Sequence, residues 1–402
     1  PEDFFDFIII DECHRGYLLD RELSDTELTF RGFEDYVSKY RRVIEYFDAV
    51  KVGLTATPAL HTVEIFGKPI YTYGYREAVV DGYLVDHEPP IQIRTELSEQ
   101  GITWRVGEAV RAYDVQRHQD DLFTAPDEIH LEIEDFNRKV VTESFNRVVC
   151  KELAKEIDPS AKAKTLVFCA NDAHADLVVV LLKEALREVY GEVDDDAVVK
   201  ITGTSDKPLD LIRRYKNEGL PRIAVTVDLL TTGIDVPAIC NLVFLRRVNS
   251  RILFDQMLGR GTRLCSEIGK EAFRVFDAVR LYEALGSMTA MQPVVADPKV
   301  SFTTLVKELG SVKQPEQQQL VFEQFIAKLQ RKKRHLDEKG LQDFETKCGM
   351  TPDQFIQKLR HMALPDVAAW FTQNPDLGEI LDRVSGKGSA PVPNSTVTTA
   401  PA

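Results

Sequence analysis

The sequence lacks paired cysteines, long apolar runs and an excess of positive charge, and each absence argues against a class of protein. Its six cysteines form no C-x-x-C pair, which argues against a zinc site and a disulfide framework and favours a reducing, cytoplasmic setting. No run of about 18 uncharged apolar residues occurs, so we expect no membrane span. The net charge of -14 argues against a wholly basic nucleic-acid-binding surface but allows local basic strips.

The chain is longer than one ordinary domain. Its 402 residues predict two or three domains, and a composition of 44% hydrophobic and 28% charged residues is typical of soluble globular proteins. The first residues, PEDFF, include neither an initiator methionine nor a signal-peptide pattern. We therefore interpret the sequence as a fragment or a processed chain.

Apolar runs alternate with helical patterns in two parts of the chain. Residues 4–10 and 49–54 are typical of buried strands, and the spacing of apolar residues over 33–47 predicts a helix between them. This order indicates a parallel α/β sheet. A second unit of the same kind begins with a long helix from residue 137. Its expected strands are 165–170, 197–202, 222–227, 241–246 and 273–278, with helices at 173–190 and 206–217.

These patterns divide the chain into five segments. They are 1–88, part of a first α/β unit; 89–136, a connecting insert; 137–285, a complete second α/β unit; 286–384, an all-α domain; and 385–402, a disordered tail. Two adjacent prolines break the pattern at the start of the insert, and small polar residues fill the tail. The expected fold class is therefore α/β, followed by an all-α domain.

Two adjacent carboxylates end the first expected strand. Asp11 and Glu12 directly follow the apolar run 7–10. Parallel α/β sheets bind ligands at the carboxyl ends of their strands. There, one carboxylate can hold Mg²⁺ while its neighbour activates a water for in-line attack. An isolated apolar run followed by Asp-Glu is more commonly a strand with an acidic turn, so this pattern alone does not decide between the two.

Two hydroxyl-rich turns fit the same chemistry. GLTATP (53–58) ends the second expected strand, although such segments often use Thr and Pro without any function. In TTGID (231–235), Gly233 permits a close approach of the backbone and Asp235 offers a carboxylate to a ribose hydroxyl. A capped helix start would have a similar sequence.

Two arginines follow in QMLGRGTR (256–263). Arg260 and Arg263 are three residues apart, so on a helix they would share one face and reach a triphosphate together. Two such arginines alone would indicate only a solvated basic face. Gln256 and Gly259 at fixed spacing favour the phosphate-binding interpretation.

The order and spacing of these motifs resemble the superfamily 2 helicase and translocase motor over residues 4–285. The matching motifs are DECH (11–14) as motif II, TAT (55–57) as motif III, TLVFCA (165–170) as motif IV, TTGID as motif V and QMLGRGTR as motif VI. DECHRG, GLTATP and YREAVVDGYLVDHEPP (75–90) are together similar to the restriction (R, motor) subunit of type I restriction–modification enzymes. The resemblance implies a partial first and a complete second RecA-like lobe, followed by a helical domain.

The resemblance also implies a role for each matching residue. Asp11 would bind Mg²⁺, Glu12 would be the catalytic base, and Arg260 and Arg263 would contact the phosphates of ATP across a cleft. The residues implied in nucleotide binding and coupling are His14, Thr55, Thr57, Gly233, Asp235, Gln256 and Gly259. Family members use ATP and Mg²⁺ to move double-stranded DNA past methyltransferase and specificity subunits. S-adenosylmethionine would enter only through those partners.

One motif of the superfamily is missing from the sequence. No G-x-x-x-x-G-K-[ST] pattern, whose amides and lysine hold the β- and γ-phosphates, occurs in the 402 residues. In the family it lies before motif II, as does the nuclease domain, so both would precede Pro1. We therefore expect the chain by itself to have little or no ATPase activity.

Two alternatives to this function stay open. The chain could belong to another superfamily 2 motor, such as an excision-repair helicase. It could also act without catalysis, by docking residues 300–384 on a methyltransferase–specificity core. A basic cluster in that segment could contact DNA or an acidic partner, or could be a solvated helix face. The cluster comprises Lys328, Arg331, Lys332, Lys333 and Arg334.

Two other groups of residues have less specific patterns. Arg246, Arg247 and Arg251 follow an expected strand near motif VI and could contact DNA or nucleotide. The histidines, among them His87 and His174, show no metal-ligand spacing and are expected to be structural or surface residues.

Overall fold

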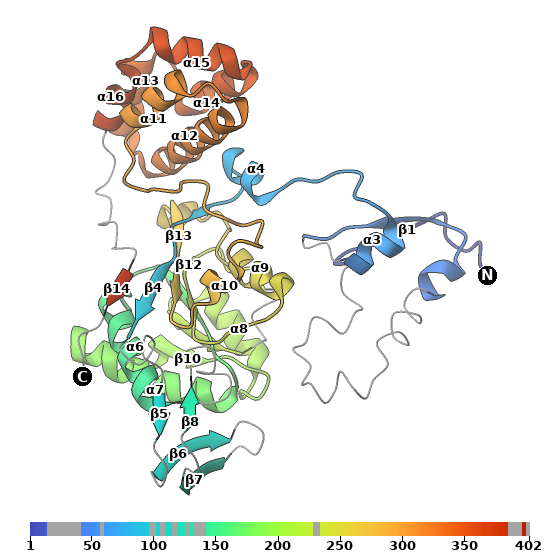
Figure 1. Cartoon of the computed structure of the whole chain (residues 1–402), viewed down its shortest axis with the longest axis vertical. Coiled ribbons are helices and arrows are strands. Elements are labelled where there is room, and N and C mark those ends of the chain that lie inside the picture. Colours follow the sequence, from blue (N-terminus) through green and yellow to red (C-terminus); the bar gives the residue numbers. More distant parts are fainter. Residues whose placement is uncertain are drawn as a thin grey trace.

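The computed structural model describes most of the chain (Figure 1). The described residues are 1–13, 42–56, 60–95, 142–227 and 234–384, with the backbone of short strands at 102–104, 109–114, 119–124, 129–131 and 396–398. Most of the helix expected over 33–47 lies outside these residues, and its end, 42–46, is helical.

The first unit contains a small parallel sheet. Strand β1 (Phe7–Ile10) pairs with β2 (Val50–Gly53), so that Ile10 lies opposite Gly53. Helix α3 (Leu60–Phe66) follows and contributes Phe66, whose ring lies over Gly53. Both expected strands are therefore confirmed, each shorter than the apolar run that predicted it. Their expected burial is wrong: Phe7, Ile9 and Val50 are exposed, because the described part of this unit is a two-stranded sheet in which every second residue faces away from the neighbouring elements.

The second unit is built on an eight-stranded parallel sheet. Its order is β10-β11-β9-β12-β13-β4-β14, with β3 beside β13. The five strands expected after residue 137 are β9 (Lys164–Phe168), β10 (Val198–Lys200), β11 (Ile223–Thr226), β12 (Ile239–Phe244) and β13 (Ala272–Asp277). Every residue of β9 and β11 is buried, because helices cover both faces of a parallel sheet. These helices are α6 (Glu143–Glu156), α7 (Asp172–Tyr190), α8 (Pro208–Asn217), α9 (Arg251–Gly259) and α10 (Leu281–Leu285) (Figure 1).

The segment expected to be a connecting insert begins inside this sheet. Strands β3 (Asp86–His87) and β4 (Ile91–Arg94) both pair in parallel with β13, on either side of the two prolines. Beyond them, β5 (Ile102–Trp104) pairs with β8 (Ile129–Leu131), and β6 (Ala109–Asp114) pairs with β7 (Gln119–Thr124). The middle of the segment is thus an antiparallel ribbon, and its start belongs to the second unit.

The tail expected to be disordered contributes a strand. Strand β14 (Thr396–Thr398) pairs in parallel with β4, Val397 lying opposite Ile93. The β-branched residues of 396–398 suit a strand, a signal that the surrounding small residues concealed. The rest of the tail lies outside the described residues.

A helical unit follows, at the top of Figure 1. Its helices are α11 (Phe302–Ser311), α12 (Pro315–His335), α13 (Glu338–Cys348), α14 (Pro352–His361), α15 (Leu364–Gln373) and α16 (Leu377–Arg383). Phenylalanines fill its core, among them Phe325, which contacts the rings of Phe302 and Phe371 edge to face. Helix α4 (Tyr75–Val80), far away in sequence, packs into the same core.

Three properties of the described chain bear on its class. The six cysteines are free thiols, as their spacing predicted. Within the described residues, no helix is both long enough and apolar enough to cross a membrane. The same part of the chain contains no group of three or more His, Cys, Asp or Glu side chains placed to hold a metal ion.

His174 is a buried structural residue at the start of α7. Its Nδ1 accepts a hydrogen bond from the backbone N–H of Ala170 (3.1 Å), and its Nε2 lies 2.9 Å from Oδ1 of Asn146. Because a backbone N–H can only donate, the ring is neutral, with its proton on Nε2. Burial disfavours the charged ring and lowers the pKa of His174 to about 3.

This histidine should make the fold sensitive to acid. The unfolded ring binds a proton below its ordinary pKa of 6.5, whereas the native ring does not, so stability falls as the pH falls. At about pH 5 the loss relative to neutral pH should be about 2 kcal/mol. His174→Gln keeps one donor and one acceptor but does not titrate. Urea unfolding of both proteins at the two pH values checks this, and an identical pH dependence in the variant would contradict it.

Candidate active site

The arginines of motif VI lie at the end of α9 rather than along it. The helix ends at Gly259, Arg260 is its C-cap residue, and Arg263 lies in the irregular segment beyond. The expectation that both arginines share one face of a helix is therefore wrong. The physical reason lies in the turn that follows: N–H groups of Arg260 and Gly261 donate to the carbonyls of Met257 and Leu258, which closes the helix with short-range bonds.

Both arginines nevertheless converge on motif V. Arg260 Nη1 donates to the backbone oxygen of Ile234 (2.6 Å), and its Nε donates to that of Gln256 (3.3 Å). Arg263 Nε lies 3.5 Å from Oδ1 of Asp235, with both side chains more than half exposed (57% and 54%). The arginines of motif VI thus form one surface with Ile234 and Asp235 of motif V, although more than twenty residues separate the two motifs in sequence. Gly233 and the threonines before it lie outside the described residues.

Gly261 is a residue of this turn that the motif analysis missed. A Cβ atom there would lie 2.4 Å from the ring of Phe273 on β13, so only glycine fits. The next residue, Thr262, is buried; its hydroxyl donates to Gly259 O (3.0 Å) and its carbonyl accepts from Val85 N (2.8 Å). The two closely spaced glycines of QMLGRGTR were the signal in the sequence that could have identified Gly261. In the structure this spacing allows close packing on β13.

The motif II carboxylates stand at the carboxyl end of the small sheet. Asp11 directly follows β1, and its Oδ1 accepts the N–H of Glu12 (2.8 Å). Glu12 has a φ of +50°, a left-handed conformation that non-glycine residues rarely adopt. The turn is tied to the end of β2, because Cys13 N donates to Leu54 O (2.9 Å). This brings the carboxylates to the same edge as Thr55.

Gly53 of the GLTATP motif also has a packing role. A Cβ atom there would lie 2.9 Å from the Cys13 sulfur and 3.0 Å from the Phe66 ring. Glycine therefore allows the end of β2 to pack against the turn that carries the carboxylates. Two of the expected residues, His14 and Thr57, lie outside the described residues.

The described candidate residues thus lie in two groups. One comprises Asp11, Glu12 and Thr55, and the other comprises Asp235, Arg260 and Arg263. Figure 1 shows β1 and α3 displaced to one side of the second unit and joined to it through α4. The facing of the carboxylates toward the arginines across a cleft stays a prediction.

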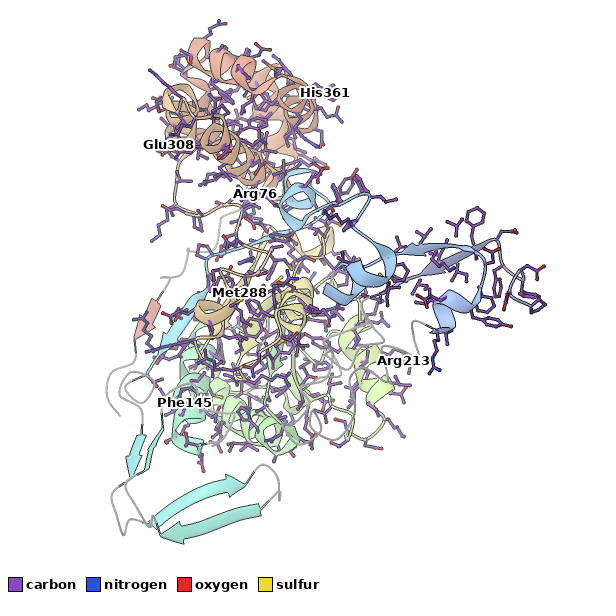
Figure 2. All side chains as sticks on the ribbon, turned by 45° about the vertical axis from the view of Figure 1, so that its right-hand side comes forward. Arg76, Phe145, Arg213, Met288, Glu308 and His361 are labelled. Atoms are coloured by element: carbon purple, nitrogen blue, oxygen red, sulfur yellow. The ribbon has the colours of Figure 1, made fainter. Side chains whose placement is uncertain are left out.

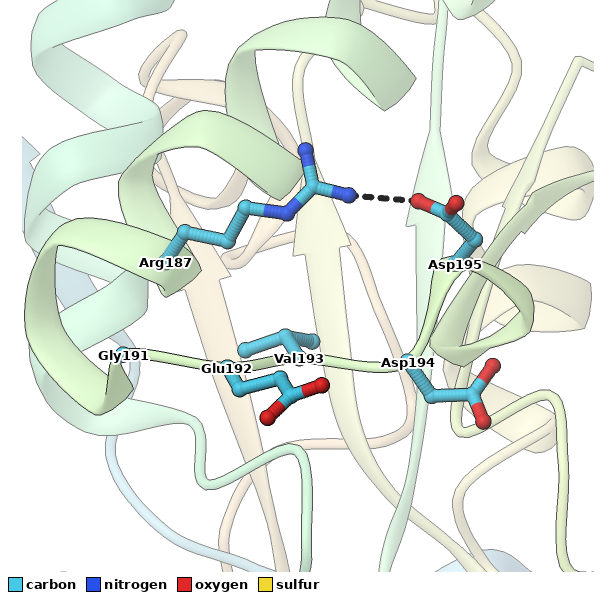
Figure 3. Close-up of a pocket in the computed structure, with 6 residues that line it drawn as sticks. All are labelled: Arg187, Gly191, Glu192, Val193, Asp194 and Asp195. Carbon is cyan, nitrogen blue, oxygen red and sulfur yellow. Dashed lines mark hydrogen bonds and ion pairs between the residues drawn. The ribbon is translucent and has the colours of Figure 1, made fainter.

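A pocket of about 790 Å³ lies elsewhere on the second unit (Figure 3). It is lined by Arg187 at the end of α7 and by residues 191–195, and Arg187 pairs with Asp195 at 2.5 Å. Because these residues directly precede β10, the pocket lies at the amino end of that strand, and β11 and β9 separate β10 from β12, which residues 234–235 precede. Its remaining carboxylates, Glu192 and Asp194, would repel phosphate, so we exclude it as a nucleotide site.

The basic cluster of α12 is neither a solvated face nor a free DNA-binding strip. Arg331 is buried and pairs with Asp86 at 2.6 Å, and Arg334 donates to the carbonyls of Gly82 and Leu84. Lys328 donates to Pro298 O, and the ammonium groups of Lys328 and Lys332 lie over the ring of Phe302. Lys333 pairs with Asp353 of α14. The cluster fastens α12 to its own chain.

The comparisons with known proteins agree with these motifs. Residues 1–60 match the family described as type III restriction enzyme, res subunit, and residues 144–265 match the helicase conserved C-terminal domain. Over 313 residues the chain is 51% identical to the type I restriction enzyme EcoKI endonuclease subunit of Escherichia coli K12. This chain is a homologue of part of the type I restriction endonuclease subunits. The 51% identity to the EcoKI subunit, compared with 24% to the putative ATP-dependent helicase IRC3 of Saccharomyces cerevisiae, favours homology to the restriction subunits over other superfamily 2 motors.

Two other relatives of this restriction-subunit homologue are more distant. The EcoAI endonuclease subunit of Escherichia coli is 29% identical over 332 residues. The fragment structure of an HsdR subunit of a type I restriction enzyme from Vibrio vulnificus YJ016 is 28% identical, with a TM-score of 0.51, over 74% of this chain and 48% of that one. The matches cover 77% of this chain but only 27% of the EcoKI subunit and 37% of the EcoAI subunit.

Proposed function

We propose that this chain is part of an ATP-dependent double-stranded DNA translocase, the motor of a type I restriction endonuclease, which moves DNA before cleavage. The convergence of Arg260 and Arg263 on residues 234–235 carries the proposal, because it joins motifs V and VI into one surface at the amino ends of the neighbouring parallel strands β12 and β13. The homology to restriction endonuclease subunits supports the substrate class.

The described residues suit a nucleotide with Mg²⁺. Although they contain no cluster of three metal-ligating side chains, Mg²⁺ needs only one or two carboxylates besides phosphate oxygens and water. Asp11 is exposed at the end of β1 and can provide one of them. The Asp235–Arg263 pair is also exposed and is therefore weak, so Arg263 can exchange its partner for a phosphate while Asp235 accepts a ribose hydroxyl.

Each residue then has a distinct task. Bound ATP and Mg²⁺ would supply the transferable phosphoryl group and neutralise part of its charge. Asp11 holds the metal, Glu12 orients and deprotonates the attacking water, and Arg260 stabilises the charge that develops on the phosphate oxygens. Thr55, at the same edge as the carboxylates, passes the nucleotide state to the DNA track. Gln256 lies one helical turn before Arg260 and couples it to motif II.

The remaining parts of the reaction come from other segments and subunits. The 402 residues contain no P-loop, so a phosphate cradle must be provided from outside them. We propose that methyltransferase and specificity subunits select the DNA and that S-adenosylmethionine acts only through them. The homology to type I endonuclease subunits supports these partners.

The decisive experiment compares two proteins, this chain alone and the chain joined to a P-loop segment from a relative. We expect Mg²⁺-dependent ATP hydrolysis, stimulated by duplex DNA, and displacement of a triplex-forming strand from the joined protein. The chain alone should show neither activity, because nothing in it holds the β- and γ-phosphates. Robust turnover by the chain alone, or a joined protein that hydrolyses ATP without moving along DNA, would contradict the proposal.

A further inference from the structure

A buried carboxylate, Asp86, lies where three parts of the chain meet. Only 1% of it is exposed. Its oxygens accept from Nη2 of Arg331 on α12 (2.6 Å) and from the Tyr75 hydroxyl on α4 (3.1 Å). They also accept the backbone N–H groups of Val294 (3.0 Å) and Val295 (2.9 Å). Asp86 therefore joins the helical unit to the segment that leads into it.

The neighbouring residue, His87, holds the same segment. Its strand, β3, pairs with β13, and its ring contacts the rings of Phe273 and Tyr282. The Nε2 atom lies 2.7 Å from the backbone oxygen of Met291. Asp86 and His87 together thus hold residues 291–295 against the second unit.

The other end of this segment is bonded to the helix of motif VI. The Met291 N–H donates to Oγ1 of Thr289 (3.0 Å), and the Thr289 hydroxyl donates to Oδ1 of Asp255. Both side chains are buried, and Asp255 lies on α9 directly before Gln256, five residues before Arg260. A continuous chain of polar contacts therefore runs from α12 to the helix that ends at Arg260.

The contact of α4 with α12 adds a second fastening at the start of this chain. Arg76, seen where the helical unit meets the rest of the molecule in Figure 2, forms an ion pair with Glu323 of α12. The Gln330 side chain donates to Val80 O (3.2 Å). Since α4, α12 and β3 are bonded to one another, a shift of α12 must move Asp86 and His87.

We propose that residues 289–295 form a strap that couples the position of the helical unit to motif VI, with Thr289 and Asp255 as positioning residues for Arg260. The catalytic meaning of that coupling rests on the proposed function, but the coupling itself does not. A load on the helical unit would act through Arg331, Asp86 and the strap on the C-terminal end of α9. Buried hydrogen-bonded networks of this kind transmit displacement because their alternatives leave polar groups unpaired.

Hydrogen exchange in the full 402-residue chain tests the coupling without any need for ATP. Thr289→Val keeps the shape of the side chain but removes the hydroxyl, and it lies outside the helical unit. We expect amide exchange at 256–263 and 291–295 to rise by about tenfold, with little change in the reference segment 143–190. Thr289→Ser should return the exchange close to the original rate, because it restores the hydroxyl.

A second variant tests the far end of the strap. Arg331→Met removes the buried charge from α12, and we expect faster exchange at 86–87, 291–295 and also 256–263. Its matched control is Lys333→Met on the same helix, which breaks the Lys333–Asp353 surface pair and should leave 256–263 unchanged. If Arg331→Met unfolds the helical unit, the Thr289 variants decide the question.

Two outcomes would overturn the coupling. One is an unchanged exchange rate at 256–263 in Thr289→Val. The other is a rise in that rate in Lys333→Met equal to the rise in Arg331→Met, which would indicate general loosening. Neither outcome bears on the proposed motor function, which is decided by ATP turnover in the protein that carries a P-loop.

Discussion

Arg260→Ala is expected to lower ATP turnover by roughly 10³-fold or more in the chain joined to a P-loop segment, while leaving duplex DNA binding nearly unchanged. The guanidinium stands at the end of α9 and reaches Ile234 in motif V. There it can stabilise charge that grows only in the transition state, so its loss should reduce kcat far more than nucleotide affinity. Steady-state kinetics and a DNA-binding titration on the same preparation measure both quantities.

Two further variants separate a catalytic role of Arg260 from a structural one. Arg260→Lys keeps the charge but lacks the planar fork, so it should recover only a small part of the lost rate. Arg263→Ala removes an exposed side chain whose pair with Asp235 contributes little to stability. All three should unfold in urea within about 1 kcal/mol of the original protein. Equal losses of turnover and DNA binding in Arg260→Ala would contradict the role.

Asp86→Ala is expected to destabilise the protein by about 3–5 kcal/mol, the largest stability effect that we predict. The substitution leaves the Arg331 guanidinium buried without its counter-charge and leaves two backbone N–H groups, of Val294 and Val295, without their acceptor. Urea unfolding followed by far-UV circular dichroism measures the loss. The helical unit should unfold at a lower urea concentration than the second unit, because Asp86 holds it in place.

The double variant shows whether the pair or the single charge matters. In the Arg331→Met background the uncompensated charge is absent. Asp86→Ala should therefore lower the free energy of unfolding clearly less in that background than in the original protein. Asp86→Asn keeps an acceptor for the backbone N–H groups, so its free energy of unfolding should lie between that of the original protein and that of Asp86→Ala. A loss below about 1 kcal/mol in Asp86→Ala, or strictly additive effects in the double variant, would contradict this explanation.

The sequence predicted the second sheet well because a parallel strand is buried on both faces. Residues 166–170 form a continuous apolar run for that reason, and β9 (Lys164–Phe168) includes its first three residues. The juxtaposition of Asp235 with Arg263 could also be anticipated, since Asp235 precedes β12, Arg263 precedes β13, and the starts of neighbouring parallel strands meet at one edge of the sheet. Apolar runs and the residues next to the ends of strands are short stretches of sequence, so they can be recognised without knowledge of the fold.

Contacts between distant segments could not be predicted in this way. Arg331 is one basic residue among several on α12, and its partner Asp86 lies 245 residues away. Strand β4 is short and follows two prolines, so nothing local indicates that it pairs with β13. The end of α9 was misjudged because Gly259 was interpreted as a phosphate-binding residue and Gly261 was overlooked. In the structure, Gly261 also makes room for Phe273.

The junction around Asp86 also sets where this family can exchange parts. A crossover anywhere between residues 95 and 289 would take Asp86 and His87 from one parent and the strap with Arg331 from the other. Asp86 would then come from one parent and Arg331 from the other, so the buried ion pair would join two side chains that did not pack together in either parent. Working chimeras should therefore inherit residues 75–95 and 289–384 together, although nearly two hundred residues separate the two segments in the chain.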